Sequence, residues 1–347
     1  MEKIDTSSKI HVSAEIPEAE LRHQIAALPR LNFIHVDHTK QSQSPQDNII
    51  TLARRDPALK AKLVLMANAG FHLYVLRDGV SSMVHHRRIP TLWRQVVVGE
   101  VTVDKNGVFS KLTPALDASD APRLLVVFSA VAATMYTPSL MRHFEQNFAT
   151  IAKYVTRNTH ILRIVDLGGV LGSFYLNSNT LPDNERNIQA RIAETAAQLG
   201  VNTENIVLYG TSKGGTAAAF HALQRGWRGV AVDPIVSDEH YVKKHRDLHF
   251  TLGTFPVPKQ QRFTELADNV HPDARLSVIC SSRSPQYPYI TDKLIQPFRD
   301  RFLFLNSENP EIRIHPDVGP KTLPHTLSQL NLYLAGLEAP TGLWTVY

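Results

Sequence analysis

The sequence predicts an α/β protein in which helices alternate with the strands of a mostly parallel sheet. From residue 123 onward, short apolar runs typical of buried strands alternate with segments of helical length and periodicity. One of these runs ends in Gly-x-Ser-x-Gly and is followed at once by a helix-forming segment. At 347 residues with 43% hydrophobic residues, the chain is long enough for one large core and an accessory segment.

Residues 1–115 are predicted to form an accessory α+β region in front of this sheet. Its expected elements are helices 18–28 and 57–69 and strands 72–76 and 95–103, the last ending in a hairpin-like turn at 104–107. Residues 113–122 begin and end with Pro-containing turns around two Asp residues, which is typical of a connector.

Residues 116–347 are predicted to form the larger α/β domain, with an irregular insertion at about 234–274. Its expected strands are 124–128, 161–165, 206–209, 229–232, 276–280 and 312–315. The helices expected between and after them are 139–155, 185–199, 216–225, 294–302 and 327–337. Such an order implies right-handed crossovers between parallel strands.

The segment Gly210-Thr-Ser212-Lys-Gly214 predicts a nucleophile elbow, the feature that places a reactive serine in an α/β-hydrolase fold. A serine on a sharp strand-to-helix turn holds its hydroxyl clear of the backbone, and the crowded turn tolerates only very small residues two positions either side. The alternative interpretation is a glycine-rich turn that only packs or binds phosphate.

The partners of Ser212 are expected in the chain order serine, acid, histidine. His325 follows a Pro/Gly-rich loop and precedes the last expected helix, so we assign it as the base that takes the serine proton. Asp292 lies after strand 276–280 and is the first choice for the acid, although it is also placed to cap a helix. Asp233, at the end of strand 229–232, is the alternative acid.

An oxyanion hole requires two backbone N–H donors. Lys213, the residue after the nucleophile, is expected to supply one, and the loop after strand 124–128 the other, with Ala130 as the assigned residue among Ser129, Ala130 and Val131.

Two further segments are expected at the carboxyl edge of the sheet, where ligands bind in such folds. The first, residues 166–175, does not match a dinucleotide-binding fingerprint and is predicted to shape a substrate pocket through Gly168, Gly169 and Tyr175. The second, residues 238–249, is rich in His and cations. Its His spacings match no metal-ligand pattern, so a zinc site is not expected. The segment is interpreted instead as a solvated helical face or as a lid that contacts an anion, with His240 at the substrate.

Composition narrows the class of protein. The net charge of +5 has its densest basic stretch at residues 85–94, which is expected to be a solvated loop or to face an anionic partner, and no nucleic-acid-binding motif accompanies it. Cys280 is the only cysteine, which excludes an intramolecular disulfide and a cysteine-based metal cluster. We expect no metal and no cofactor. The first residues lack the apolar core of a secretory signal, and no apolar run reaches membrane-spanning length, so a cytoplasmic location is expected.

Three segments carry a family resemblance: the Gly210-Thr-Ser-Lys-Gly-Gly215 elbow, residues 166–175 and residues 232–241. Together they resemble bacterial capsular polysaccharide biosynthesis proteins of the XcbB/CpsF type, over most of the chain. The elbow is also similar to that of accessory secretion proteins that O-acetylate glycans on adhesins. The resemblance implies Ser212 as nucleophile and His325 as base, a cell-surface glycan or its precursor as substrate, and capsule-assembly proteins as partners.

The sequence is therefore interpreted as a serine acyl-transfer enzyme, an O-acyltransferase or esterase acting on a carbohydrate with a separate acyl donor. One alternative is a non-catalytic component of a glycan-assembly machine that retains the fold. Another is a peptidase or lipase, which would require a peptide-shaped or apolar cleft.

Overall fold

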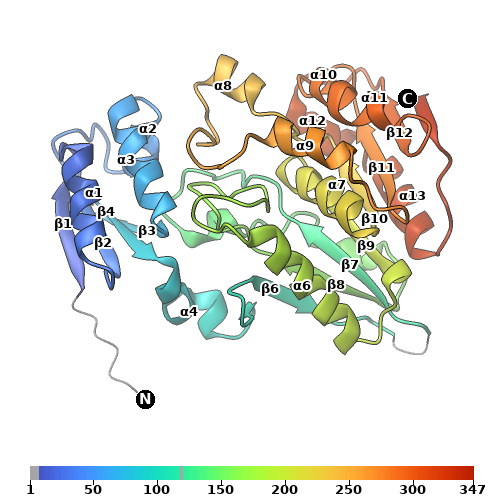
Figure 1. Cartoon of the computed structure of the whole chain (residues 1–347), viewed down its shortest axis with the longest axis horizontal. Coiled ribbons are helices and arrows are strands. Elements are labelled where there is room, and N and C mark those ends of the chain that lie inside the picture. Colours follow the sequence, from blue (N-terminus) through green and yellow to red (C-terminus); the bar gives the residue numbers. More distant parts are fainter. Residues whose placement is uncertain (1–7, 118–119) are drawn as a thin grey trace.

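The fold consists of two sheets, a small one at the N-terminal end and a large one that forms the body of the molecule (Figure 1). It is seen in a computed structural model that describes residues 8–117 and 120–347. Residues 1–7, where no targeting signal is expected, lie outside the described residues, as do residues 118–119 of the expected connector. Within the described chain no helix is long and apolar enough to cross a membrane.

The small sheet has the strand order β1-β2-β4-β3 and is packed against three helices. Its strands are β1 (Lys9–Ser13), β2 (Phe33–Asp37), β3 (Phe71–Arg77) and β4 (Val80–His85), and its helices are α1 (Glu18–Ala27), α2 (Ile49–Ala53) and α3 (Pro57–Asn68). Helix α2 begins at a capping box formed by Asn48 and Thr51. Helix α3 begins with Asp56 as its cap and Pro57 at its first position, which together satisfy or remove the free N–H groups of that end.

The large sheet has the strand order β13-β12-β11-β10-β9-β7-β8-β6-β5. Every neighbouring pair is parallel except β5–β6 and β6–β8, which are antiparallel. The strands are β5 (Thr102–Val103), β6 (Phe109–Thr113), β7 (Arg123–Phe128), β8 (Thr159–Ile164), β9 (Ile206–Thr211), β10 (Arg228–Val232), β11 (Arg275–Cys280), β12 (Leu303–Ser307) and β13 (Gly342–Val346).

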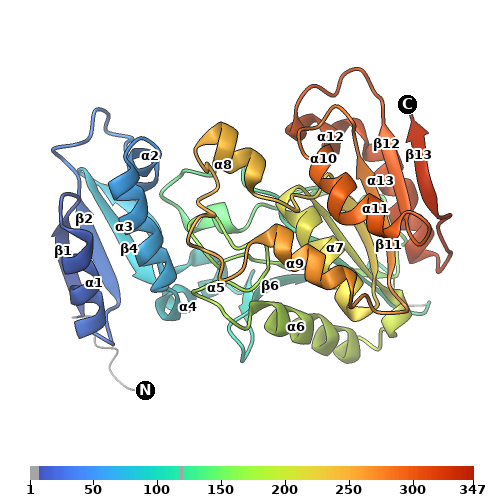
Figure 2. The ribbon, with the colours of Figure 1, turned by 45° about the horizontal axis from the view of Figure 1, so that its top comes forward.

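Helices cover both faces of the large sheet (Figures 1 and 2). The longer ones are α6 (Asn184–Gln198), α7 (Lys213–Arg225), α9 (Lys259–Ala267) and α13 (Leu323–Leu334), and the short ones include α8 (Glu239–His245), α10 (Tyr287–Ile290), α11 (Gln296–Phe298) and α12 (His315–Lys321). Alternate residues of β7 enter different cores: Leu124 and Val126 pack with α6 and α7, whereas Leu125 and Val127 pack with α13. Burial on both faces explains why these strands are continuous apolar runs.

Several predicted elements are wrong. Strands β5 and β6 lie before the expected boundary at residue 115 but belong to the large sheet. The expected strand 95–103 is reduced to the two-residue β5, because residues 95–97 belong to α5 (Arg94–Val97), which follows α4 (Ile89–Leu92), and residues 98–101 form a turn. The expected helix 139–155 is reduced to two 3₁₀ turns, η2 (Leu140–His143) and η3 (Ile151–Lys153).

The basic stretch at residues 85–94 is folded rather than solvated throughout. The guanidinium of Arg87 donates to the side chain of Asn32 and to the carbonyls of Pro29 and Leu31, so it ties β4 to the loop before β2. Burial is the main reason that the pKa of His85 falls to about 3 and that the pKa of His86 is lowered, so both imidazoles are neutral at pH 7.

Candidate active site

Ser212 lies at the sharp turn between β9 and α7, as an elbow requires. Its backbone has φ 57° and ψ −117°, a conformation that L residues rarely adopt. The turn is held at both ends, because the Ser212 N–H donates to the carbonyl of Val232 and the Ser212 carbonyl accepts from the N–H of Thr216. The hydroxyl is thereby presented at the carboxyl edge of the sheet.

The glycines of the motif are required by close backbone approach. A Cβ on Gly210 would lie 2.1 Å from the carbonyl of Gly214, and a Cβ on Gly214 would lie 2.2 Å from the carbonyl oxygen of Phe128. Real Cβ atoms do not approach backbone atoms this closely, so only glycine fits at positions 210 and 214.

Ser212, His315 and Asp233 form a continuous line of hydrogen bonds. The Ser212 Oγ lies 2.7 Å from His315 Nε2, and His315 Nδ1 lies 2.6 Å from Asp233 Oδ2. A carboxylate accepts hydrogen bonds only, so Nδ1 carries the proton and Nε2 is left as the acceptor for the serine hydroxyl. This tautomer is the one in which an imidazole can take a proton from serine.

Asp233 is held rigidly beneath the imidazole. It follows β10, its N–H donates to the carbonyl of Ile279, and its φ of 42° turns the chain out of the sheet. The side chain is fully buried, and its Oδ2 accepts a second hydrogen bond from Ser284 Oγ at 2.5 Å. The carboxylate is thus oriented by a neutral donor as well as by His315.

His325 and Asp292, the first choices from the sequence, lie elsewhere. His325 is the third residue of α13, and its Nδ1 is buried without a hydrogen-bond partner among the described residues. Asp292 is about 60% exposed and pairs with the neighbouring Lys293 at 2.9 Å. The structure therefore replaces His325 by His315 and brings the alternative acid, Asp233, to the site.

The missed histidine has a simple cause. The sequence pattern placed the last strand before the final helix at 312–315, whereas the strand is β12, and His315 begins the helix that follows it. The short run Leu303-Phe-Leu305 is the signal that would have located β12 and made His315 the first histidine after it.

The backbone N–H groups expected to form the oxyanion hole differ in whether they already make a hydrogen bond. The N–H of Lys213 opens α7, where it has no partner within the helix. The Ala130 N–H instead donates to Asn147 Oδ1 at 2.6 Å, and the Ser129 N–H donates to the Tyr175 hydroxyl at 2.7 Å. Of the three residues considered after β7, only Val131 has an N–H without a hydrogen bond within the described chain.

The side chain of Lys213 is buried and anchors the segment 166–175 to the elbow. Its Nζ lies 3.0 Å from Asp166 Oδ2, with both side chains at most 1% exposed. Asp166 Oδ1 in turn accepts from the N–H and the hydroxyl of Ser173. This buried ion pair fixes the residue that follows the nucleophile.

The three pocket residues predicted on this segment are packed tightly. A Cβ on Gly168 would lie 2.1 Å from Ser173 Oγ, and a Cβ on Gly169 would lie 3.0 Å from the carbonyl oxygen of Gly172. Tyr175 is fully buried, which raises the pKa of its hydroxyl, and it donates to the carbonyl of Ile164. These three residues are closely packed within the protein, and Tyr175 is linked to the loop after β7 through the Ser129 N–H.

Helix α8 lies within the segment between β10 and β11 (Figure 2), and one of its residues contacts the His315 ring. The ring of Tyr241 stands edge-on to His315 at 6.3 Å, and burial raises the pKa of its hydroxyl. His240 Nε2 lies 3.2 Å from His245 Nε2, and the pKa of His240 is lowered mainly by burial and then by the charges of His245 and His315. His240 is therefore close enough to the site for its charge to interact with that of His315.

Comparisons with known proteins agree with this fold. No protein-family model matches the sequence, and a search among curated proteins finds no match. Among solved structures, the chain is similar to the Glycosylation Associate Protein (Gap123) complex of Streptococcus agalactiae, with a TM-score of 0.51 and 16% identity. The match covers 76% of this chain and 53% of the other, so this chain spans about half the length of that protein.

Two further solved structures are less similar. The capsule O-acetyltransferase of Neisseria meningitidis serogroup A has a TM-score of 0.48 and 14% identity, covering 67% of this chain and 92% of that one. The fluorophosphonate-binding serine hydrolase FphF of Staphylococcus aureus has a TM-score of 0.47 and 11% identity, covering 66% and 96%. The strand order, the elbow after β9 and the acid and histidine after β10 and β12 show that the chain has an α/β-hydrolase fold.

Proposed function

We propose that this protein is a serine-dependent acyl-transfer enzyme, an O-acyltransferase or esterase. The observation that carries the proposal is the hydrogen-bonded line from Ser212 Oγ through His315 to Asp233 Oδ2. A serine hydroxyl is a weak nucleophile until an adjacent base accepts its proton, and His315 Nε2 is placed to do so.

In the first step the proton of the Ser212 hydroxyl moves to His315 Nε2 as Oγ bonds to the carbonyl carbon of an acyl donor. Asp233 stabilises the imidazolium through the Nδ1 hydrogen bond. The bond from the acyl carbon to the leaving group then breaks, and His315 returns the proton to that group. In the second step His315 deprotonates a sugar hydroxyl or water, which bonds to the acyl carbon. The bond from that carbon to Ser212 Oγ then breaks, and His315 returns the proton to Oγ.

The oxyanion that forms in each step needs preorganised donors. The N–H of Lys213 is available at the start of α7. The second donor is Ala130, once Asn147 moves away from its N–H, or Val131. Losing one such donor costs about 3 kcal/mol of transition-state stabilisation in enzymes of this kind.

The carbohydrate substrate is supported by the sequence resemblance at the elbow and at residues 166–175 and 232–241. It also agrees with the name of the similar Streptococcus agalactiae protein, which is a glycosylation-associated protein. On this proposal one ligand is an acyl donor and the other is a hydroxyl of a cell-surface glycan or its precursor.

The first test is the intact mass of the protein after exposure to a small fluorophosphonate, with Ser212→Ala alongside. The proposal expects one adduct on the wild-type protein and none on the variant. The absence of an adduct on the wild type would contradict it. A series of model esters of increasing acyl chain length then separates an enzyme for short acyl groups from a lipase, which would prefer long chains.

One observation favours a second candidate, a non-catalytic component of a glycan-assembly machine. The Ala130 N–H is engaged by Asn147, which leaves the assigned oxyanion donor occupied. A non-catalytic role expects glycan output to be unchanged by Ser212→Ala, whereas an enzyme expects loss of acyl groups or of polymer.

A further inference from the structure

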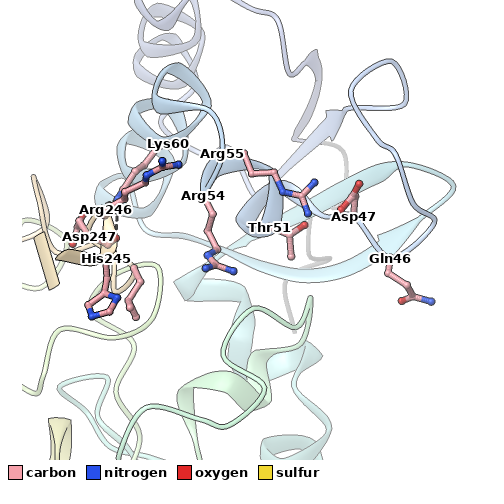
Figure 3. A pocket seen from close by; sticks show the side chains of 10 residues that line it. Gln46, Asp47, Thr51, Arg54, Arg55, Lys60, His245, Arg246 and Asp247 are labelled. Atoms are coloured by element: carbon pink, nitrogen blue, oxygen red, sulfur yellow. Dashed lines mark hydrogen bonds and ion pairs between the residues drawn. The ribbon is translucent and has the colours of Figure 1, made fainter. Parts of the chain in front are cut away.

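A cavity of about 360 Å³ lies between the N-terminal region and the segment that follows α8 (Figure 3). One wall comes from α2, α3 and the loop before them, and the other from the end of α8 and the residues after it. We refer to it as the cationic pocket, since most of its charged lining residues are basic. Those charged and titratable residues are Asp47, Arg54, Arg55, Lys60, His245, Arg246 and Asp247.

The two carboxylates of the cationic pocket are engaged within the protein. Asp47 Oδ2 accepts hydrogen bonds from the N–H groups of Gln43 and Ser44. Asp247, with a side chain only 2% exposed, accepts from the N–H and the hydroxyl of Thr251 and pairs with a lysine. These acids therefore hold loops in place, and although the charge of Arg55 contributes to lowering the pKa of Asp47, neither acid forms an ion pair with an arginine of the pocket.

Lys60 joins the two walls. Its Nζ lies 3.0 Å from Asp247 Oδ2 and donates to the carbonyls of Arg246 and Asp247 at 2.8 and 2.7 Å. With three oxygen partners, this ammonium is a structural tie, and the pocket is preformed across the junction of the two regions.

Arg54, Arg55 and Arg246 make no ion pair within the described chain. The guanidinium of Arg54 is held over the ring of Tyr136 at 4.4 Å, and Figure 3 shows its side chain between the two walls. A planar guanidinium presents paired N–H donors that match the oxygens of a phosphate group, and it is weakly hydrated compared with an ammonium. Three of them around one cavity favour a multiply charged phosphate over a single carboxylate.

The cationic pocket is connected to the catalytic imidazole through one aromatic side chain. The ring of His245, which lines the pocket, lies 5.9 Å from that of Tyr241, and Tyr241 lies 6.3 Å from His315. His245 and Tyr241 are one turn apart on α8, so the pocket and His315 lie along the same helix, and a ligand that joins the pocket to Ser212 would pass along this turn.

We propose that the cationic pocket binds a phosphate-bearing portion of a ligand whose other end reaches Ser212. Binding of the phosphate does not depend on the chemistry at Ser212, whereas its assignment to the substrate rests on the proposed function. Two sources share this chemistry: an acyl donor with a nucleotide phosphate handle, or an acceptor glycan with a sugar phosphate.

The test is calorimetric titration of the full-length Ser212→Ala protein with inorganic pyrophosphate at low salt. Saturable binding is expected, weakening as salt is added. Arg55→Gln and Arg246→Gln are each expected to lower the affinity about tenfold, the effect of one charge-assisted hydrogen bond. Arg299→Gln, an exposed arginine at the end of α11, is the matched control and should bind as the parent does.

Absence of saturable binding by the parent would overturn the proposal. So would unchanged affinity in both pocket variants, provided their thermal unfolding midpoints match that of the parent. Displacement of pyrophosphate by a nucleoside 3′,5′-bisphosphate would assign the phosphate to the donor, and displacement by a sugar 1-phosphate would assign it to the acceptor.

The two proposals fail separately. Fluorophosphonate labelling of the wild type without pyrophosphate binding would leave the serine chemistry standing and remove the pocket. Pyrophosphate binding without labelling would retain the pocket and remove the serine chemistry.

Discussion

His315 Nδ1 and Asp233 Oδ2 lie 2.6 Å apart although 82 residues separate them in the sequence. The carboxylate follows β10 and the imidazole opens α12 after β12, so two strands of the sheet bring them together. The same imidazole reaches Ser212 from the other nitrogen. This pairing fixes the tautomer of His315 and is the relationship on which the catalytic predictions depend.

His315→Ala is expected to lower the rate of fluorophosphonate labelling of Ser212, and of model-ester hydrolysis, by roughly 10⁴-fold, because His315 is the only base among the described residues that hydrogen-bonds to the hydroxyl. Time-resolved intact mass measures the first rate. His325→Ala is the matched control and is expected to retain nearly full activity, since the His325 Nδ1 has no hydrogen-bond partner in the part of the chain that the structure describes. A large loss in His325→Ala with little loss in His315→Ala would contradict the assignment.

Asp233→Asn is expected to lower the hydrolysis of a model ester by roughly 10⁴-fold while leaving the fold intact. The amide is close in size to the carboxylate but favours the wrong tautomer of His315 and stabilises no imidazolium. Initial rates under substrate-limiting conditions give the comparison. Asp292→Asn, an exposed acid paired only with Lys293, should behave as the wild type does.

The local part of the site could be predicted from the sequence, and the long-range part could not. Ser212 was found because a strand, a sharp turn and a helix start all lie within ten residues. His315 was missed because its identification requires knowing which apolar run is the last strand before it, and Leu303-Phe-Leu305 directly follows a helical segment.

The edge strands of the large sheet also could not be predicted from the sequence, because their pairing is long-range. β6 pairs with β8 across about 50 residues, and β13 pairs with β12 only after the last helix. Tertiary packing decides which strands pair at a sheet edge. The alternating hydrophobic pattern of a strand predicts that the strand exists but does not predict its neighbour. In the segment expected as helix 139–155, the buried guanidinium of Arg142 binds the carbonyls of Leu73, Ser139 and Val170, so tertiary contacts override the helical pattern.

Lys213→Met is expected to destabilise the protein by about 3–5 kcal/mol, because it leaves the buried carboxylate of Asp166 unpaired. Denaturant unfolding measures the change. The double variant Lys213→Met/Asp166→Asn is expected to recover part of the loss, since neither member of the buried pair then carries a charge. Lys243→Met, which breaks an exposed pair with Glu239, is the control and should change stability by less than about 1 kcal/mol. Equal effects at the two lysines would contradict the role given to the buried pair.

Asn147→Ala is expected to raise the rate of fluorophosphonate labelling about fivefold. The Asn147 side chain occupies the Ala130 N–H at 2.6 Å, and a developing oxyanion must displace it at a cost of about 1 kcal/mol if Ala130 is the second donor. The backbone carbonyl of Asn147, which accepts from Arg163, is retained in the variant. An unchanged or slower rate would exclude Ala130 and leave Val131 as the second donor.

Acidification is expected to destabilise the protein, and His221 should account for a measurable part of this effect. Burial lowers the pKa of His221 to about 4, against an unfolded value near 6.5. Between these values the unfolded chain binds the proton and the folded chain does not, so stability falls as the pH drops from about 6.5 toward 4. For this residue the loss of unfolding free energy between pH 7 and pH 5 is about 2 kcal/mol.

His221→Gln tests this assignment. The variant is expected to be less stable at pH 7, because it disturbs hydrogen bonds to Gln189 and Tyr175, but it should lose less stability between pH 7 and pH 5. Urea unfolding at the two pH values makes the comparison, and an equal loss in both proteins would mean that His221 does not remain neutral in the folded state.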